Sequence, residues 1–293
     1  MKALITGASG IIGSYLVKTA PKIFEVFPCC FENRINQKMV RMDITDLDMV
    51  RYIVLDIKPD VVIHCASESR TDWVEENKLE GWHVNISGLN NLLIACKAVK
   101  SHFVYVSSNN VYDGMAPPYS ECSDQNAVNE YGRTKILAEE LVKTYPFISL
   151  IVRPILQHGN LRTSRRNTFV SRAIETLKAG KELKVAQDMI SQPTYALDCA
   201  EAIWKLIYYQ KKQHDSFNIA PVDAINLYDF AVDIAKVYEL EPRLIEPVAF
   251  ASFSSLSKRP LNTTYDVSKL YSVGITIPGH MDSLKRMKEE ANA

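Results

Sequence analysis

A glycine triad near the start of the chain, "GASGIIG", is the feature that most constrains its fold. Gly7, Gly10 and Gly13 are three residues apart. The apolar run at 2–6 predicts a buried strand, and the segment at 11–20 predicts a helix. A strand that turns through glycines straight into a helix is typical of the first βαβ unit of a nucleotide-binding sheet. The sequence therefore predicts dinucleotide binding, although an ordinary glycine-rich turn can have the same spacing.

Each glycine of the triad has an expected role. Gly7 permits a tight turn, Gly10 lets a diphosphate approach the backbone, and Gly13 allows close packing of helix on strand. The free N–H groups of the first helical turn, where Ile11 and Ile12 lie, favour anionic oxygens. We therefore assign these five residues to a cofactor site.

The rest of the first half alternates apolar runs with amphipathic stretches. Continuous apolar strands between helices predict an α/β fold with a Rossmann-type, doubly wound parallel sheet covered on both faces. Pro28 is awkward in the second strand, because proline lacks the N–H of a sheet ladder. The predicted strands are 24–30, 60–66, 102–108 and 148–156, and the predicted helices are 46–57, 85–100 and 131–143.

The pattern loosens after about residue 156. We expect a dinucleotide-binding domain over 1–156, with later contributions from about 190–220, and a smaller, mainly substrate-binding lobe over 157–293. The predicted elements of this half are helices near 169–179, 196–210 and 227–238 and strands near 183–187 and 216–220.

Composition narrows the classes of partner and compartment. Among 293 residues, 34 Lys and Arg balance 34 Asp and Glu, which gives no general support for nucleic-acid or acidic-membrane binding. No apolar run is long enough to span a bilayer, and the N-terminus does not read as a signal peptide. The six cysteines form no CxxC pair and no zinc-type spacing. We expect a cytoplasmic protein with no metal site.

The segment after the second predicted strand, "CCFENR", bears on the choice of dinucleotide. An acid there favours NAD through the ribose 2′-hydroxyl, whereas an arginine favours NADP through the 2′-phosphate. Both Glu32 and Arg34 are present. Because of Arg34 we predict NADP, with NAD as the alternative. Asp43 either bonds the adenine amino group or caps the following helix, and Ile44 beside it is assigned to the same cofactor site.

"YGRTK" carries the chemistry of the predicted active site. Tyr131 and Lys135 lie on one face if this stretch is helical. A tyrosine has a pKa near 10, and a nearby ammonium lowers it by stabilising the phenolate. Tyr131 can then donate a proton to a carbonyl oxygen while hydride adds to the carbon, and Ser108 at a strand tip can orient that carbonyl. A surface Tyr–Lys pair is the alternative when this motif is taken alone.

The combination of these motifs resembles the extended short-chain dehydrogenases/reductases. Within that family the chain is most similar to the dTDP-4-dehydrorhamnose reductase branch, which includes the regulatory β subunit of methionine adenosyltransferase. The matching stretches run nearly end to end and include "ALITGASGIIGSYL", "PDVVIHCASESRTDWVEEN", "VNISGLNNL", "SSNNVYDG", "PPYSE", "NEYGRTKILAEE", "SQPTYALDCAEAI" and "KRPLNTTYDVSKL".

The resemblance implies roles for residues at the matching positions. Ser108, Tyr131 and Lys135 would form the catalytic trio, with Tyr131 and Lys135 also contacting the cofactor. It also implies a homodimer, for which the helices near 85–100 and 131–143 could pair, although core packing gives the same pattern. Further cofactor contacts would be Cys65, Ala66, Ser67, Arg153 and Ile155, and substrate contacts would be Asn109, Asn167, Gln192, Thr194 and Arg259.

Asn109 and Asn110 separate this chain from its relatives. Related 4,6-dehydratases carry an Asp-Glu pair here, and those carboxyls eliminate water as acid and base. An amide neither takes nor gives a proton at working pH, so dehydration is disfavoured. The reductase branch usually has an Asp and an aromatic residue at these positions, which both asparagines also lack. The alternative role of both asparagines is to stabilise the turn that leaves the strand.

Three functions remain open from the sequence. The leading one is an NADP-dependent reductase of a keto group on a nucleotide-linked deoxysugar. The second is a cofactor-binding regulatory subunit like the methionine adenosyltransferase β subunit, because "HCASESRTDWVEEN", "CFENR" and "RPILQHGN" resemble that protein as much as the reductases. The third is a nucleotide-sugar epimerase.

Overall fold

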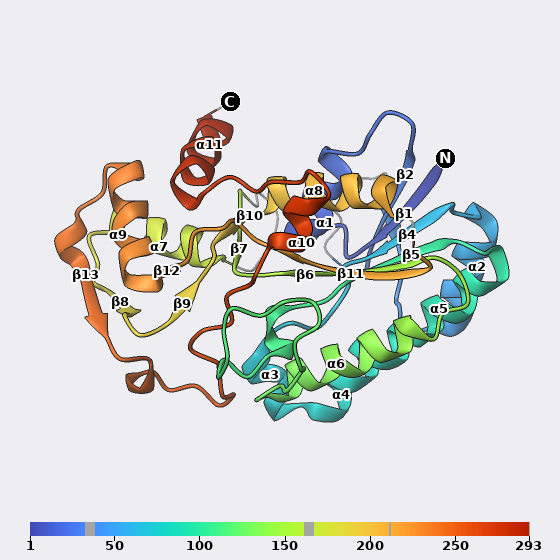
Figure 1. Cartoon of the computed structure of the whole chain (residues 1–293), viewed down its shortest axis with the longest axis horizontal. Helices are drawn as coiled ribbons and strands as arrows, with labels where there is room; N and C mark the ends of the chain where they lie inside the picture. The colour runs from blue at the N-terminus through green and yellow to red at the C-terminus, as the bar shows by residue number, and fades with distance from the viewer. Residues whose placement is uncertain (33–38, 161–166, 211, 293) are drawn as a thin grey trace.

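A seven-stranded, entirely parallel sheet forms the centre of the protein in the computed structural model, which describes residues 1–32, 39–160, 167–210 and 212–292 (Figure 1). The strand order β3-β2-β1-β4-β5-β6-β11 reverses direction between β1 and β4, as in a doubly wound nucleotide-binding fold. The predicted Rossmann-type sheet is therefore confirmed. Its strands are β1 (Lys2–Thr6), β2 (Glu25–Cys30), β3 (Val40–Arg41), β4 (Val61–His64), β5 (His102–Val106), β6 (Ser149–Pro154) and β11 (His214–Ile219).

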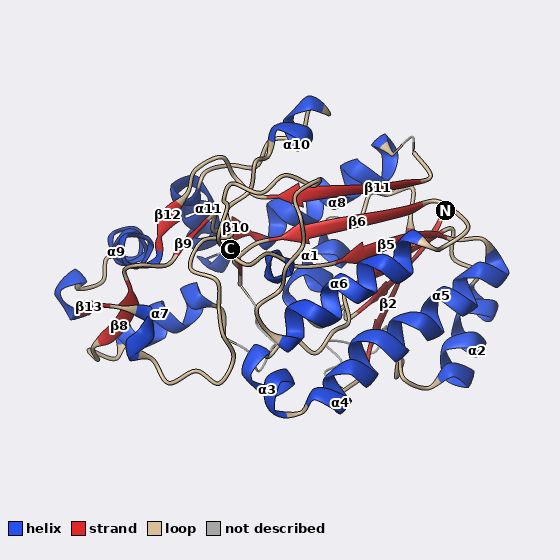
Figure 2. Cartoon of the chain, turned by 60° about the horizontal axis from the view of Figure 1, so that its bottom comes forward, coloured by secondary structure: helices blue, strands red, loops and turns tan. Residues whose placement is uncertain are grey.

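Helices cover both faces of this sheet (Figure 2). Successive residues of each strand point to opposite faces, so Ala3 and Ile5 of β1 enter one core cluster and Leu4 the other. The first cluster is closed by α1 (Ile11–Lys18) and α8 (Ala196–Tyr209). The second is closed by α2 (Leu47–Ile57), α5 (Gly88–Val99) and α6 (Glu130–Lys143).

Pro28 fits β2 because its missing N–H falls where no ladder bond is made. The Cys29 carbonyl accepts from Ala8 on the β1 side, and the Cys30 carbonyl accepts from Met42 on the β3 side. By alternation Pro28 faces the β3 side, and the ladder with β3 begins only at Cys29, opposite Val40. Within the described residues, the proline therefore costs the β2–β3 ladder no hydrogen bond.

The second half of the chain forms a lobe beside the carboxyl edge of the sheet and also returns to the sheet itself (Figure 1). Three two-stranded sheets pair β7 with β10, β8 with β13 and β9 with β12. The elements are β7 (Gln157–His158), α7 (Phe169–Lys178), β8 (Leu183–Ala186), β9 (Ile190–Ser191), β10 (Thr194–Tyr195), β12 (Ile225–Asn226), α9 (Leu227–Tyr238), β13 (Ile245–Val248), α10 (Ser268–Ser272) and α11 (His280–Asn292).

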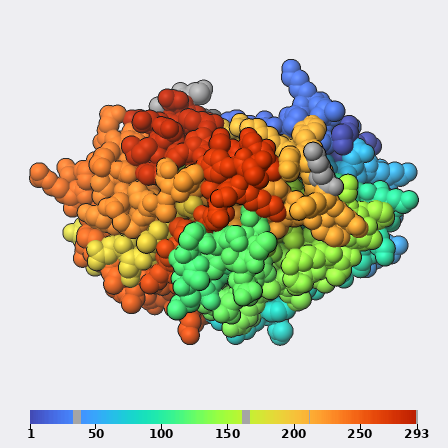
Figure 3. Space-filling view, viewed as in Figure 1, coloured from blue at the N-terminus to red at the C-terminus, as the bar shows by residue number. Residues whose placement is uncertain are grey.

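Several short elements were not anticipated from the pattern. The expected helix at 85–100 starts as α5 at Gly88, preceded by a π-helical turn, His83–Ser87. Before it lie α3 (Thr71–Glu76) and α4 (Lys78–Trp82). After β5, a 3₁₀ turn over Asn109–Val111 leads into a segment that lies against the C-terminal chain, where Tyr119 pairs with Tyr265 (Figure 3). No helix in the described ranges is long and apolar enough to cross a membrane.

Candidate active site

In the glycine turn after β1, Gly7 and Gly13 each lie very close to neighbouring backbone. Gly7 has φ +64°, and a Cβ there would lie 2.6 Å from the backbone nitrogen of Ala66. A Cβ at Gly13 would lie 2.3 Å from the Gly7 carbonyl oxygen, so α1 packs on the turn only without a side chain. Among the described residues, a Cβ at Gly10 meets one atom within 4 Å, the same oxygen at 3.2 Å. Gly7 and Gly13 therefore meet steric needs of the fold, whereas Gly10 leaves open space.

The start of α1 presents its backbone to that space. Gly10 is the N-cap residue, no side chain caps it, and the first turn carries no acidic residue. The first N–H groups of a helix have no intrahelical partner and lie at the positive end of the helix dipole. This end of α1 therefore favours an anionic group such as a diphosphate.

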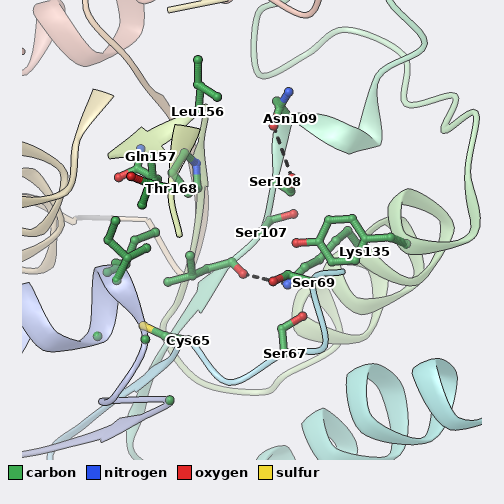
Figure 4. Close-up of a pocket in the computed structure, with 18 of the residues that line it drawn as sticks. Cys65, Ser67, Ser69, Ser107, Ser108, Asn109, Lys135, Leu156, Gln157 and Thr168 are labelled. Atoms are coloured by element: carbon green, nitrogen blue, oxygen red, sulfur yellow. Dashed lines mark hydrogen bonds between the residues drawn. The ribbon is translucent and has the colours of Figure 1, made fainter. Parts of the chain in front are cut away.

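A cavity of about 340 Å³ runs from the glycine turn across the carboxyl ends of β1, β4, β5 and β6 (Figure 4). Open α/β sheets bind ligands at this edge, where the strand order reverses. Its lining is Gly7, Gly10, Ile11, Ile12, Gly13, Cys65, Ser67, Ser69, Val106, Ser107, Ser108, Asn109, Tyr131, Lys135, Pro154, Leu156, Gln157, Asn167 and Thr168. The space and the uncapped helix fit a dinucleotide.

Tyr131 and Lys135 enter the cavity from consecutive turns of α6. Both are buried, and Lys135 Nζ lies 5.6 Å from the centre of the Tyr131 ring. The ammonium donates to the Val106 carbonyl at the end of β5, at 3.1 Å. Burial lowers the pKa of Lys135 to about 8, and the negative charge of the Glu139 carboxylate opposes this shift. At neutral pH Lys135 is thus still mainly charged beside the phenol.

Ser108 reaches the same cavity because α6 approaches the turn after β5 very closely. A Cβ at Gly132 would lie 2.1 Å from the Asn110 carbonyl oxygen, so only glycine permits this approach. Asn129 caps α6 by accepting from the Gly132 N–H at 2.8 Å. The glycine that follows Tyr131 therefore brings α6 against the Ser108 turn.

A buried ion pair holds α6 on the sheet. Glu139 accepts from Arg153 on β6 at 2.8 and 2.6 Å and from Ser107 after β5 at 2.6 Å. Arg153 points away from the cavity, which is lined by its neighbour Pro154. Its predicted place beside the nicotinamide is therefore not seen, and Ile155 is likewise packed in a core cluster with Val111 and Tyr112.

Two predicted cofactor residues, Asp43 and Ile44, follow β3. Asp43 accepts from the N–H and hydroxyl of Thr45, at 2.9 and 2.7 Å. Ile44 is buried and in contact with Gly88. Neither these residues nor Ala66 line the cavity, and Arg34 lies outside the described residues.

The predicted substrate residues divide into two groups. Asn109 and Asn167 line the cavity. Gln192 and Thr194 are buried away from it, where Gln192 bonds the backbone of Pro221 and Tyr265. Arg259 pairs with Asp72 of α3 at 3.1 Å on the surface.

Several lining residues were missed by the sequence reasoning: Ser69, Val106, Ser107, Leu156, Gln157 and Thr168. Val106 and Ser107 lie near the end of the predicted strand 102–108, and Leu156 ends the predicted strand 148–156. Their position at the ends of strands was the signal available in the sequence. Leu156 has φ +35°, a left-handed conformation that costs a non-glycine residue about 1–3 kcal/mol and clusters at functional sites.

Asn85, in the π-helical turn, supports the site from behind and was also missed. Its amide accepts from Ser67 and the Glu68 N–H, at 3.0 and 2.8 Å, and donates to Thr134 on α6 at 3.1 Å. It thereby ties the loop after β4 to the helix that carries Tyr131. π-Helical turns occur frequently at functional sites.

Comparison with known proteins agrees with this geometry and confirms the resemblance seen in the sequence. The model of the family described as RmlD substrate binding domain matches residues 1–292. Methionine adenosyltransferase 2 subunit beta of Bos taurus is 26% identical over 94% of this chain and 83% of that protein.

Two solved reductases superpose over nearly their whole length. A dTDP-4-dehydrorhamnose reductase of Clostridium acetobutylicum has a TM-score of 0.89 and 30% identity, covering 100% of both chains. The dTDP-4-dehydrorhamnose reductase of Bacillus anthracis, solved in complex with NADP, has a TM-score of 0.88 and 26% identity, covering 99% of both. These homologues are oxidoreductases of the extended short-chain type.

Proposed function

Since the chain belongs to the RmlD substrate binding domain family, we propose that it is an NADP(H)-dependent reductase of a keto group on a nucleotide-linked deoxysugar. One observation carries the proposal: Ser108, Tyr131 and Lys135 line the same cavity as the glycine turn and the uncapped start of α1. A bound dinucleotide would supply hydride at this site.

The chain's own residues would manage the proton and the carbonyl. Tyr131 donates its phenolic proton to the oxygen that becomes a hydroxyl. The Lys135 ammonium, 5.6 Å from the ring, favours the resulting phenolate. Ser108 donates a hydrogen bond to the same oxygen and so orients it. No carboxylate follows Ser108, since Asn109 and Asn110 stand there, and this supports reduction over sugar dehydration.

Two relatives' ligands support the finer assignments. The Bacillus anthracis reductase was solved with NADP, which favours NADP(H), while a Thermus thermophilus UDP-glucose 4-epimerase of similar fold was solved with NAD. The names of both reductase structures point to dTDP-4-dehydrorhamnose as the substrate to try first.

The test follows NADPH oxidation by absorbance with dTDP-4-dehydrorhamnose as substrate, with NADH in a parallel assay. We expect turnover that requires the sugar nucleotide and is faster with NADPH. NADPH binding without turnover of any 4-keto sugar nucleotide would contradict the reductase. Cofactor that stays tightly bound and does not exchange while the sugar is isomerised would instead indicate an epimerase.

A regulatory subunit is the second candidate, favoured by the 26% identity to a methionine adenosyltransferase β subunit. Against it, this chain covers 83% of that protein but 100% of the Clostridium acetobutylicum reductase. Purified methionine adenosyltransferase would be mixed with the chain and analysed by size-exclusion chromatography. A stable complex, together with absent turnover, would support the regulatory function.

We also propose a cytoplasmic homodimer. Ile94 on α5 and Leu137 on α6 are exposed apolar side chains on neighbouring helices, 46% and 37% accessible. All six cysteines are free thiols, as a reducing compartment would keep them. Light scattering on the purified chain tests the dimer, and Leu137→Glu should shift it to monomer.

A further inference from the structure

The hydroxyl of Ser108 has both of its acceptor positions occupied by one residue. A serine hydroxyl has one hydrogen to donate and two lone pairs to accept with. Ser108 Oγ accepts from the backbone N–H of Asn110 at 3.2 Å and from its side-chain amide, Nδ2, at 3.1 Å. The hydrogen of Ser108 is directed at Asn109 Oδ1, 3.4 Å away. That distance exceeds the usual 2.5–3.0 Å of an O–H···O bond, so a closer acceptor in the cavity can take the hydrogen.

The orientation of the Asn110 amide is fixed from the start of α6. Asn129 Oδ1 accepts from the Gly132 N–H at 2.8 Å, while Asn129 Nδ2 donates to the Lys258 carbonyl at 2.9 Å. These backbone partners leave Asn129 one possible orientation. Its Nδ2 also donates to Asn110 Oδ1 at 3.3 Å, which turns Asn110 Nδ2 towards Ser108.

Every bond of this series runs in the same direction. Gly132 donates to Asn129, Asn129 to Asn110, Asn110 to Ser108 and Ser108 to Asn109. Asn109 Nδ2 donates onward to Thr263 Oγ1 at 2.7 Å, which keeps its Oδ1 on the Ser108 side. Such chains polarise each member, and this one begins at the positive end of a helix.

We propose that Asn110 is a positioning residue that holds the Ser108 hydroxyl as a hydrogen-bond donor towards the reacting oxygen of the substrate. The inference rests on the proposed reductase function and deepens it. With both lone pairs occupied, Ser108 can only donate, which suits a carbonyl oxygen that gains negative charge. A carboxylate at position 110 has no hydrogen to give and would instead accept the hydrogen of Ser108.

Two substitutions at one position test this. Asn110→Asp keeps the shape of the side chain but reverses its role, whereas Asn110→Ala removes it and leaves the backbone donor in place. We expect kcat to fall in the order wild type, Asn110→Ala, Asn110→Asp, with the aspartate variant at least about tenfold below wild type. The dissociation constant for NADPH should stay within about twofold. A merely structural role gives the opposite order, because aspartate replaces asparagine with less change of volume than alanine.

A double-mutant cycle with Ser108→Ala asks whether Asn110 acts through Ser108. In that background Asn110→Asp should lower kcat by less than about twofold. A full tenfold loss there would show a general effect of the new negative charge and would overturn the proposal.

A readout without turnover separates this inference from the reductase itself. In protein labelled with ¹⁵N-asparagine, Ser108→Ala should shift the side-chain amide signal of Asn110 and leave that of Asn91, which bonds Ile44 and Thr45, unmoved. An unshifted Asn110 signal overturns the inference even in an active enzyme. If the signal shifts but the chain reduces no sugar nucleotide, the hydrogen bond from Asn110 to Ser108 is supported. The reductase function is then refuted, and with it the role in catalysis proposed for Asn110.

Discussion

Glu139 and Arg153 form a two-bond ion pair inside the protein, with Nε–Oε1 and Nη2–Oε2 distances of 2.8 and 2.6 Å and at most 3% of either side chain exposed. Glu139 lies one helical turn beyond Lys135 and two beyond Tyr131 on α6, and Arg153 lies on β6. The pair therefore fixes how far α6 reaches along the sheet, and so where Tyr131 and Lys135 meet the cavity.

Removing one charge of this pair should destabilise the fold strongly. Glu139→Gln leaves Arg153 buried without its counter-charge, which costs about 3–5 kcal/mol of unfolding free energy. Glu140→Gln is the matched control, because Glu140 is the next residue and pairs with Lys143 on the surface. Urea unfolding measures both, and equal losses in the two variants would refute the role of the buried pair.

The same pair predicts how stability changes at low pH. Burial alone would raise the pKa of Glu139, but hydrogen bonds and charge from Arg153 hold it below its ordinary value. The stabilisation is therefore complete above the ordinary glutamate pKa and is lost as pH falls below it. Glu139→Gln should flatten the acid limb of unfolding free energy against pH.

Tyr131→Phe should remove turnover and leave NADPH binding nearly intact. The variant lacks the phenolic oxygen that gives the proton, so we expect kcat to fall by about 100-fold or more. Fluorescence titration with NADPH should give a dissociation constant close to that of wild type. Undiminished turnover in this variant would refute the proposed mechanism.

Lys135→Met should stabilise the protein at neutral pH while abolishing turnover. Burial lowers the pKa of Lys135 to about 8, against roughly 10.4 for an unfolded lysine. Holding the charge therefore costs the fold about 1–3 kcal/mol below pH 8, and this cost fades as pH rises through 8 to 10. Between about pH 8 and 10 the unfolding free energy of the wild type should rise relative to that of Lys135→Met. Parallel pH curves for the two proteins would contradict the buried ammonium.

Gly10→Ala and Gly13→Ala should separate cofactor binding from folding. A Cβ at Gly10 meets the Gly7 oxygen at 3.2 Å and no other atom of the described residues within 4 Å. We therefore expect nearly unchanged thermal stability and an NADPH affinity reduced about tenfold or more. A Cβ at Gly13 lies 2.3 Å from the same oxygen and should cost about 1–3 kcal/mol of stability. Unchanged NADPH affinity in Gly10→Ala would count against a diphosphate at this turn.

The sequence by itself determined the parts of this protein that rest on local pattern. Continuous apolar strands between amphipathic helices specified the parallel sheet, and glycines at 7, 10 and 13 specified the turn at its edge, because periodicity and glycine spacing are local properties. The i, i+4 spacing likewise put Tyr131 and Lys135 on one face of α6.

Tertiary structure decided which residues meet in the cavity, because that depends on contacts between segments far apart in the chain. The family resemblance implied that Arg153 contacts the cofactor. In the folded chain Arg153 lies on β6 and bonds Glu139 of α6 on the side of the strand away from the cavity. In the sequence, Asn110 was notable because it stands where the dehydratases carry a carboxylate. In the folded chain α6 packs closely against this turn, as Gly132 permits, and the Asn110 amide bonds Ser108. Strand alternation and helix packing determine where the side chains of Arg153 and Asn110 point, and neither can be read from the residues one at a time.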